Sequence, residues 1–474
     1  MKVTFIGHAS ILVEAGGLRI LSDPWWAGPC FGMQWWAYPR PVTAPVEDVP
    51  PDYIYISHGH ADHLHRGTLS RLPKSAVCLV AAELGLAPAL RTAGFEVREL
   101  AARDPVALND TVRIEITPTV GGDSLCVVTD GDETCLNLND ALHSAPRDVQ
   151  ARVADDLNRR YGRADYLFCG YGIASHFPVC IDVPGRDAAR TAADRQKYFN
   201  RQWAWIVHAL SPRFAFPFAA DVVFLDRAIS WANTAVHNGE RPTAALTGPL
   251  ASPDVQAIDI APGFAIADGE IASDVRWSPV DNAEIAAAFG DDVETANRST
   301  AADAAAVDEL VAKIAANAEL CGAYLREVAR DYRFLVRLAE SPFAIGIGKR
   351  GGDVVVSRLD AAKVREADYD VVFRTRYPYV RRALSEAYGH ETISVGSGGV
   401  FRYRDRADAD ANLHAELMLL LRVHDAPPRS RFGDQPKWLY ALKTGIKRVL
   451  RGLVGRAPEP DLYDNRAWIR YRDG

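Results

Sequence analysis

The sequence lacks the features that mark disulfide-rich, iron–sulfur and membrane-spanning proteins. Its seven cysteines are scattered, their number is odd, and none stands in a C-x-x-C or C-x-H pair. This argues against a disulfide framework, a zinc ribbon and an iron–sulfur cluster bound by this chain. No stretch approaches the roughly 18 apolar residues needed to cross a bilayer. We expect a soluble protein in a reducing, cytoplasmic setting, with most cysteines as small core residues.

The chain also lacks an excess of positive charge and a recognisable leader. Its 54 Lys and Arg stand against 61 Asp and Glu, a net charge of -7, so a broad nucleic-acid-binding surface is not indicated. The first residues, Met1–Ile6, read directly into a strand, and we expect no signal or transit peptide. The length of 474 residues predicts two or three domains at roughly 100–200 residues each.

What the chain does contain is a dense histidine cluster, SHGHADH, at Ser57–His63. It follows an apolar strand pattern and precedes a helix-like segment. A strand that ends in a tight loop presents such side chains at the sheet edge where open α/β folds place their chemistry. Imidazole nitrogens and carboxylate oxygens bind zinc, iron and manganese, so the cluster predicts a metal site. Its candidate ligands are His58, His60, Asp62 and His63.

Strands and helices alternate along the first 280 residues. Hairpin patterns cover residues 3–21 and 112–139, and the later strands and helices are separated by short turns. The later strands are predicted at 166–169 and 213–217, and helices at 83–93, 147–160 and 188–210. Hairpins at the start and helices between the later strands predict two mixed sheets packed face to face, with helices outside.

The pattern changes in the last 200 residues. Apolar residues recur at helical spacing over 302–340, which predicts one long helix or a helical pair. A hairpin over 343–357 and strands at 370–374, 392–396 and 400–404 predict a small α+β module.

The chain is therefore expected to have three parts. They are a metal-binding catalytic domain over 1–280, a helical connector over 281–340 and a C-terminal α+β domain over 341–474. The last part ends in a basic amphipathic helix at 438–456, which suits a membrane surface, a partner, or its own domain.

Three segments in this order resemble the metallo-β-lactamase superfamily. They are Gly7–Ser10 (GHAS), Asp23–Trp25 (DPW) and His58–His63 (HGHADH). The chain is more similar to the metallo-β-lactamase-like part of CMP-N-acetylneuraminate hydroxylase, through residues 23–31, 53–58, 197–200 and 217–219. The resemblance covers roughly residues 1–280. It implies an α/β fold, a four-layer αββα sandwich, here with a C-terminal helical and small α+β extension.

The resemblance also implies a site for one or two metals. His58 and His60 would bind the first metal, and Asp62 and His63 the second. The superfamily then supplies another histidine, a bridging aspartate and a last histidine. The region expected to hold the third ligand, residues 117–123, contains no histidine and offers only Asp123.

Carboxylates stand at the remaining ligand positions too. Asp140 matches the bridging aspartate, and the last position falls near Asp221 or Asp226. Two loop histidines, His176 and His237, are the alternatives that could complete the site.

Aromatic residues surround the cluster in the sequence. Four tryptophans in twelve residues predict either a wall over the metal site or a packed loop. The candidate substrate contacts are Trp25, Trp26, Trp35, Trp36 and Tyr171, and the candidate catalytic residues are His8, Asp62 and His176.

A site rich in carboxylate oxygens favours iron or manganese over zinc. The sequence and the resemblance together predict two divalent metal ions, iron first, in an oxygenase that uses O2 to hydroxylate a small metabolite. The hydroxylase family carries a Rieske module, whose Cys and His ligand pairs are missing here, so electrons would come from a separate ferredoxin or reductase.

Two alternatives stay open. One is a metal-dependent hydrolase of esters, lactones, thioesters or phosphodiesters, in which Asp62 or Asp123 orients a metal-bound hydroxide. The other is a binding protein with a degenerate metal site. A homo-oligomer is left open as well.

Overall fold

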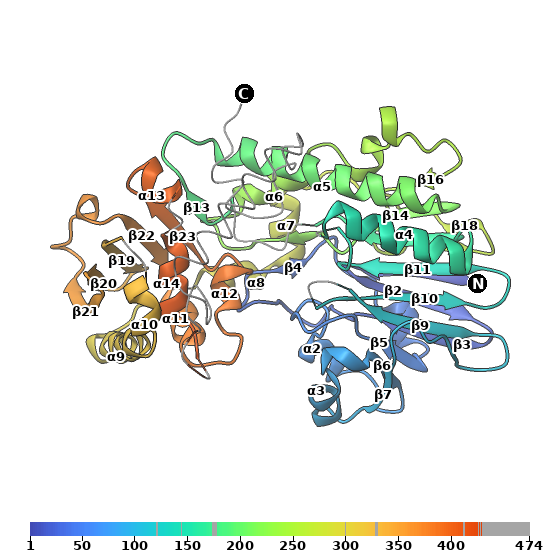
Figure 1. Cartoon of the computed structure of the whole chain (residues 1–474), viewed down its shortest axis with the longest axis horizontal. Helices are drawn as coiled ribbons and strands as arrows, with labels where there is room; N and C mark the ends of the chain where they lie inside the picture. Colours follow the sequence, from blue (N-terminus) through green and yellow to red (C-terminus); the bar gives the residue numbers. More distant parts are fainter. Residues whose placement is uncertain are drawn as a thin grey trace. The chain divides into compact units, whose positions relative to one another are not determined.

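The computed structural model describes residues 1–119, 122–143, 145–172, 178–298, 300–327, 330–410, 413–424, 426 and 428. The chain divides into two compact units (Figure 1). The first comprises Met1–Ile173 and Ala192–Ala296, and the second Ala174–Thr191 and Asn297–Gly474. This division is coarser than the three predicted parts, which stay a prediction. No helix in the described ranges is both long and apolar enough to span a membrane.

The first unit contains an eight-stranded mixed sheet that begins with the predicted hairpins. The strands β1, β2 and β3 pair antiparallel, whereas β3, β5, β6 and β7 run parallel. In spatial order the strands are β18 (Glu270–Ser273), β17 (Ala265–Ala267), β1 (Lys2–Gly7), β2 (Ser10–Ala15), β3 (Leu18–Ser22), β5 (Tyr53–Tyr55), β6 (Val77–Ala81) and β7 (Glu96–Leu100).

A seven-stranded sheet faces it across the central core. Its strands β9, β10 and β11 form the predicted meander, and β11, β12, β14 and β16 run parallel. In spatial order they are β16 (Gln256–Ala257), β14 (Phe214–Phe218), β12 (Tyr166–Gly170), β11 (Thr134–Asn139), β10 (Ser124–Thr129), β9 (Arg113–Pro118) and β8 (Val106–Ala107).

Three apolar cores hold four layers together. The central core lies between the sheets and includes Phe5, Ile116 and Phe168. Helices α2 (Arg66–Leu69) and α3 (Ala87–Thr92) pack on the outer face of the first sheet, where they share a core with β5 and β6. Helices α4 (Arg147–Tyr161) and α5 (Ala188–Leu210) cover the outer face of the second (Figure 1). This confirms the predicted αββα sandwich.

Short elements complete the first unit. They are α1 (Ala44–Glu47), α6 (Trp231–His237), α7 (Asn282–Phe289), α8 (Asp291–Asn297), the 3-10 turns Ala82–Leu84, Pro242–Ala245 and Gly248–Leu250, and the pair β4 (Trp36–Ala37) and β15 (Val222–Val223). All seven cysteines of the chain are buried and none forms a disulfide, as the sequence predicts for core residues.

The second unit is built on a six-stranded sheet. Its spatial order is β13 (Ile181–Asp182), β23 (Gly399–Tyr403), β22 (Val371–Thr375), β19 (Tyr332–Leu338), β20 (Phe343–Arg350) and β21 (Asp353–Asp360). The described helical elements are α9 (Ala304–Leu320), α10 (Gly322–Glu327), the 3-10 turn Glu366–Asp368, α11 (Tyr377–Ala383), α12 (Glu391–Ser394), α13 (Arg406–Asp410) and α14 (His414–Leu420).

Two predicted elements of this unit are wrong. The helical pattern predicted to reach residue 340 gives way to β19, which lies between β20 and β22 and whose run Phe334–Val336 is buried on both faces of the sheet, whereas Arg333 is exposed. A strand buried on both faces is apolar nearly throughout and mimics helical spacing. The strand predicted at 392–396 is instead α12, because both edges of β23 are already taken by β13 and β22. The basic helix predicted at 438–456 lies outside the described residues.

Candidate metal centre

The first sheet brings three ligand-bearing segments to one edge. The strands β1, β3 and β5 all point the same way, because β1 and β3 each pair antiparallel with β2, and β3 pairs parallel with β5. Their carboxyl ends therefore lie side by side. His8 follows β1, Asp23 follows β3, and the loop Ser57–His63 follows β5.

The second sheet meets this edge with its own strand ends. Asp140 follows β11, Tyr171 follows β12 and Asp221 follows β14, and these three strands are parallel neighbours. The Ser124 hydroxyl donates to the Ser57 carbonyl at 2.6 Å, which ties the two sheets together beside the cluster. The site is thus assembled from the carboxyl ends of strands in both sheets, as open α/β folds do.

Backbone strain is concentrated at these strand ends. His8, Asp23, Asn139 and Ala219 are non-glycine residues with positive φ, at 49°, 38°, 47° and 55°. Each left-handed L-residue costs roughly 1–2 kcal/mol. Such strain persists where the surrounding structure enforces it, and it tends to gather at functional sites.

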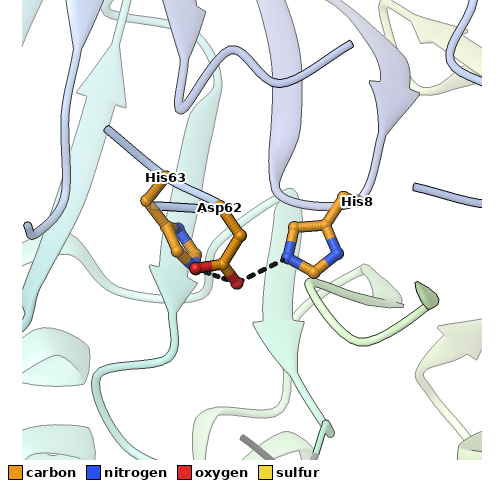
Figure 2. Close-up of side chains that lie close together, drawn as sticks. All are labelled: His8, Asp62 and His63. Carbon is orange, nitrogen blue, oxygen red and sulfur yellow. Dashed lines mark hydrogen bonds and ion pairs between the residues drawn. The ribbon is translucent and has the colours of Figure 1, made fainter. Parts of the chain in front are cut away.

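One group of ligand-type side chains consists of His8, Asp62 and His63 (Figure 2). The Asp62 Oδ2 lies 3.2 Å from the His8 Nε2 and 3.4 Å from the His63 Nε2. All three side chains are buried, with 4%, 4% and 0% of their surface exposed. Their ligand atoms all lie within 4.8 Å of one another.

A second group consists of His58, His63 and Asp140. The His63 Nε2 lies 3.4 Å from the Asp140 Oδ2, so this histidine belongs to both groups. His60 extends the group, with its Nδ1 2.8 Å from the His58 Nε2. The Asp123 Oδ1 lies 3.7 Å from the His58 Nδ1, which places this carboxylate beside the cluster.

Asp23 supports the cluster through contacts with Ser57 and His63. Its side chain is fully buried, accepts from the Ser57 backbone N–H at 2.8 Å, and lies 3.2 Å from the His63 Nδ1. The Asn139 amide donates to the same carboxylate. These contacts fix the His63 ring so that its Nε2 faces Asp62 and Asp140. A carboxylate on the far nitrogen of a metal-binding histidine is a common supporting arrangement.

The donor set fits a cation. Three of its atoms, the Asp62 Oδ1, the His63 Nε2 and the Asp140 Oδ1, are buried and have no hydrogen-bond partner among the described residues. Buried polar atoms without a partner cost roughly 1–3 kcal/mol each, so a cluster of them calls for a ligand. Histidine nitrogens with carboxylate oxygens suit zinc, iron and manganese.

Burial and neighbouring charges set the protonation of the metal-free cluster. Burial opposes the charged form of His63, but Asp62 and Asp140 outweigh it and raise the pKa of His63 well above its usual value. Burial, with His63 nearby, lowers the pKa of His58 well below its usual value. Burial, with Asp140 nearby, raises the pKa of Asp123. His63 therefore carries the proton that a metal ion would displace.

The four tryptophans occupy different surroundings. Trp25 is fully buried and packs edge-on against His8, with ring centres 4.9 Å apart. The backbone N–H of Trp26 donates to the Thr68 hydroxyl at 2.9 Å. Trp35 packs on Phe31, and Trp36 joins an apolar core with Phe289. Of the four, the described contacts place Trp25 against the cluster, and the substrate roles of all four stay predictions.

Tyr171 and His237 belong to a separate buried network. The Tyr171 hydroxyl donates to the Asp221 Oδ1 at 2.6 Å, and the His237 Nε2 lies 2.7 Å from the Val222 carbonyl oxygen. The Arg241 guanidinium stacks on the Tyr171 ring at 4.9 Å. The two cation-binding groups found among the described residues include neither Tyr171 nor His237.

The two remaining predicted residues also lie outside those groups. The Asp226 Oδ1 accepts from the Ala228 backbone N–H at 3.0 Å, within its own turn. His176 lies outside the described residues.

Sequence reasoning named Asp23 as part of a motif but gave it no role, and it gave none to Ser57 or Asn139. All three support the cluster. A signal was present, since each is a polar residue at the end of a strand or within two residues after it. Which of these ends meet depends on sheet order, and the sequence does not state that order.

A family model described as a beta-lactamase superfamily domain matches residues 2–149. The first unit has a metallo-β-lactamase fold. The match covers the strand ends that carry His8, Asp23, the histidine loop and Asp140.

Proteins related in sequence match parts of the chain. A Mycobacterium tuberculosis protein, provisionally named a Rieske 2Fe-2S iron–sulfur protein, is 30% identical over 223 residues, 44% of this chain and 41% of the relative. The cytidine monophosphate-N-acetylneuraminic acid hydroxylase of Danio rerio is 40% identical over 75 residues, 16% of this chain and 13% of that enzyme. The chain spans less than half the length of these curated relatives.

Solved structures resemble part of the chain more loosely. Igni18, a metallo hydrolase of Ignicoccus hospitalis, is 14% identical with a TM-score of 0.38, covering 56% of this chain and 97% of that chain. An isothiocyanate hydrolase from Delia radicum gut bacteria is 16% identical with a TM-score of 0.36, covering 56% and 99%. At these TM-scores no function is inferred from them.

Proposed function

We propose that this chain is a metalloenzyme that binds two divalent ions, iron in preference to zinc or manganese, and hydroxylates a small metabolite with O2. The observation that carries the proposal is the carboxylate-rich donor set. Asp62, Asp140 and Asp123 stand among the histidines, and Asp123 lies where the superfamily pattern expects a third histidine. Hard oxygen donors mixed with imidazole favour iron.

The reaction needs an electron donor. Hydroxylation of a C–H bond consumes one O2, two electrons and two protons, and it yields the alcohol and one water. Bound iron would supply the O2 chemistry, and the electrons would come from a separate iron–sulfur protein, since this chain has no pair of Cys and His ligands for such a cluster. The similarity to a protein named for its Rieske cluster and to a hydroxylase supports the assignment of O2 chemistry to this chain and of electron supply to a separate protein.

The chain's own residues would prepare the site. His58, His60, Asp62, His63, Asp140 and Asp123 would hold the ions. Asp23 orients the His63 ring, and the buried Trp25 ring closes one side of the cluster and keeps water away from His8. The Asp62 Oδ1 has no hydrogen-bond partner among the described residues, so it is free to orient a water or substrate hydroxyl.

The same feature of Asp62 favours a hydrolase as the second candidate. A carboxylate beside two bound zinc ions can orient a hydroxide for attack on an ester, lactone, thioester or phosphodiester. A metal-binding protein without catalysis is the third candidate.

Metal identity and oxygen uptake separate these candidates. We expect protein from iron-supplemented cells to hold near-stoichiometric iron by elemental analysis, and to consume O2 only when a reduced ferredoxin or a chemical reductant is added. Bound zinc with turnover of p-nitrophenyl acetate or a lactone would favour the hydrolase instead. Protein that takes up no metal even after addition would favour the third candidate.

Asp123→Ala tests the carboxylate-rich donor set directly. We expect this change to weaken metal binding, with apparent Kd rising roughly tenfold to a hundredfold as for a lost supporting carboxylate. His58→Ala and Asp62→Ala should strip the metal. An Asp123→Ala protein with unchanged metal content and activity would contradict the assignment of iron on the basis of its oxygen donors.

A further inference from the structure

His8 occupies an unusual place in the fold. It lies in the β1–β2 turn, far in the sequence from the histidine loop, yet its ring points at Asp62 (Figure 2). Its φ of 49° is left-handed, which a bulky residue adopts only when the surrounding structure enforces it.

Three features hold this strained turn. The β1–β2 register shifts between Phe5 and Gly7, and Gly7 itself has a φ of 149°. The Ala219 backbone N–H, from the end of β14, donates to the His8 carbonyl at 2.9 Å. A bulge of this kind re-aims a side chain, and here it turns the imidazole from the sheet toward the cluster.

We propose that His8 is a metal ligand, and that its Nε2 with the Asp62 Oδ2 and the His63 Nε2 forms part of the coordination shell of one of the two ions. His8 would take the place of the last histidine of the superfamily pattern, a position that falls near Asp221 or Asp226 in this sequence. The inference rests on the proposed metal site, and it adds a ligand from a segment outside the HGHADH motif.

The spacing of the atoms supports coordination. Ligand atoms that share one metal at about 2.0–2.2 Å lie about 2.9–3.5 Å apart in tetrahedral or octahedral geometry. The observed separations are 3.2 Å for His8–Asp62 and 3.4 Å for His63–Asp62. Hydrogen bonds between imidazolium and carboxylate are shorter, at about 2.7–2.9 Å.

The two cation-binding groups can be reconciled in one way. An imidazole nitrogen has a single lone pair, so the His63 Nε2 serves one ion. In this assignment the His63 Nε2 serves the ion bound by Asp62 and His8, whose Oδ2 and Nε2 lie 3.2 Å apart. His58, His60 and Asp140 are then left for the other ion.

A competing role for His8 is to donate a hydrogen bond that positions Asp62. The substitutions His8→Ala and His8→Asn distinguish the two roles. Asparagine tolerates the left-handed backbone and can still donate to Asp62, but its amide is a poor metal ligand. His65→Asn is the matched control, because His65 is a buried histidine nearby that caps α2 through the Thr68 N–H, and asparagine also caps helices well.

The test measures Co²⁺ and Fe²⁺ binding to apo-protein by competition with a chromophoric chelator, with metal per chain by elemental analysis. We expect both His8 variants to lose one of two equivalents or to bind it at least tenfold more weakly. The Co²⁺ absorption spectrum should change, whereas His65→Asn should match the wild type. Circular dichroism of each apo-variant checks the fold.

Other results would overturn the inference. Wild-type metal binding by His8→Asn, with loss in His8→Ala, would make His8 a positioning residue for Asp62. Unchanged binding in both His8 variants would remove it from the shell while the proposed function stands. A wild-type protein that binds no metal would overturn the proposed function itself.

Discussion

At the scale of single residues, Asp23 shows how the cluster is held. It is completely buried, and its two oxygens receive the Ser57 backbone N–H, the Asn139 amide and the His63 ring. A carboxylate this deep is stable only because each of its oxygens is hydrogen-bonded. The contacts join the ends of β3, β5 and β11, so one side chain sets the relative positions of three ligand-bearing strand ends.

Asp23→Asn is predicted to weaken metal binding without removing a ligand. The amide keeps one acceptor oxygen for Ser57 but presents an NH2 group to His63, so the imidazole loses the partner that fixes its orientation. We expect the apparent Kd for Fe²⁺ or Zn²⁺ to rise roughly tenfold to a hundredfold, as for other supporting residues of metal sites. Chelator competition measures this, and Asp226→Asn serves as a control on a carboxylate that lies outside the two cation-binding groups of the described residues.

The same affinity in Asp23→Asn as in the wild type would mean that the Ser57 and Asn139 contacts alone position the loop. In that case the apo-protein should still be destabilised, because the variant buries donors that face other donors. Thermal unfolding of the chelated protein separates this structural effect from the effect on metal binding.

The site was predictable from the sequence in part. His58, His60, Asp62 and His63 lie within six residues of sequence, so local spacing alone identifies them as a cluster. His8 and Asp140 come next to it only through the order of strands in two sheets. His237 had the right chemistry, but its Nε2 lies at hydrogen-bond distance from a backbone carbonyl instead. A sequence shows which residues have metal-binding side chains more readily than it shows which of them lie close together in the fold.

At the scale of elements, a buried ion pair connects α4 to β9. Glu115 on β9 is buried, and its carboxylate receives the Arg160 guanidinium, with one N–O distance of 3.0 Å, and the Tyr161 hydroxyl at 2.5 Å. Burial opposes the charged form of Glu115, but the hydrogen bonds from Arg160, Tyr161 and Thr117 outweigh it and lower its pKa. This contact secures the outer helix to the sheet that carries Asp123 and Asp140.

Glu115→Gln should destabilise the first unit by about 2 kcal/mol at pH 7, the order of magnitude of a hydrogen bond to a charged group. A carboxylate whose folded pKa is lowered contributes stability above its ordinary pKa of 4.5, and it loses that contribution as the pH falls through the folded value. The difference in unfolding free energy between wild type and variant should thus stay constant from pH 7 to about pH 5 and shrink below.

Urea unfolding of chelated protein at several pH values measures this difference. Asp148→Asn is the matched control on the same helix, since Asp148 and Arg152 form an exposed pair that contributes little. A difference that grows as the pH falls would mean that Glu115 is neutral in the folded protein.

Elements were predicted well where local pattern and pairing agree. The hairpins of β1–β3, β9–β11 and β20–β21 alternate or run apolar between turn residues, and their partners are adjacent in sequence. The failures, β19 and α12, both depend on pairing with distant strands. An apolar segment becomes a strand only where a free sheet edge receives it, and the local pattern does not reveal which edges are free.

At the scale of the whole molecule, the members of the two cation-binding groups, with His60 and Asp123, lie in one of the two compact units. His8, the histidine loop, Asp123 and Asp140 belong to the first unit, and the second has its own sheet and a core around Leu335, Ala344 and Val372. A ligand that binds only the folded state stabilises the part that binds it. The metal should therefore act on the unfolding of one unit.

We predict two unfolding transitions in scanning calorimetry, of which chelation lowers one. At a free metal concentration of 100 times Kd, binding contributes about 2.7 kcal/mol, and at about 2–4 °C per kcal/mol this lowers the midpoint on chelation by roughly 5–11 °C. In Asp62→Ala, which serves as the metal-free reference, chelator should shift neither midpoint. If chelation moves both midpoints equally, or if a single transition is seen, then the two units unfold together and the metal stabilises the chain as one cooperative body.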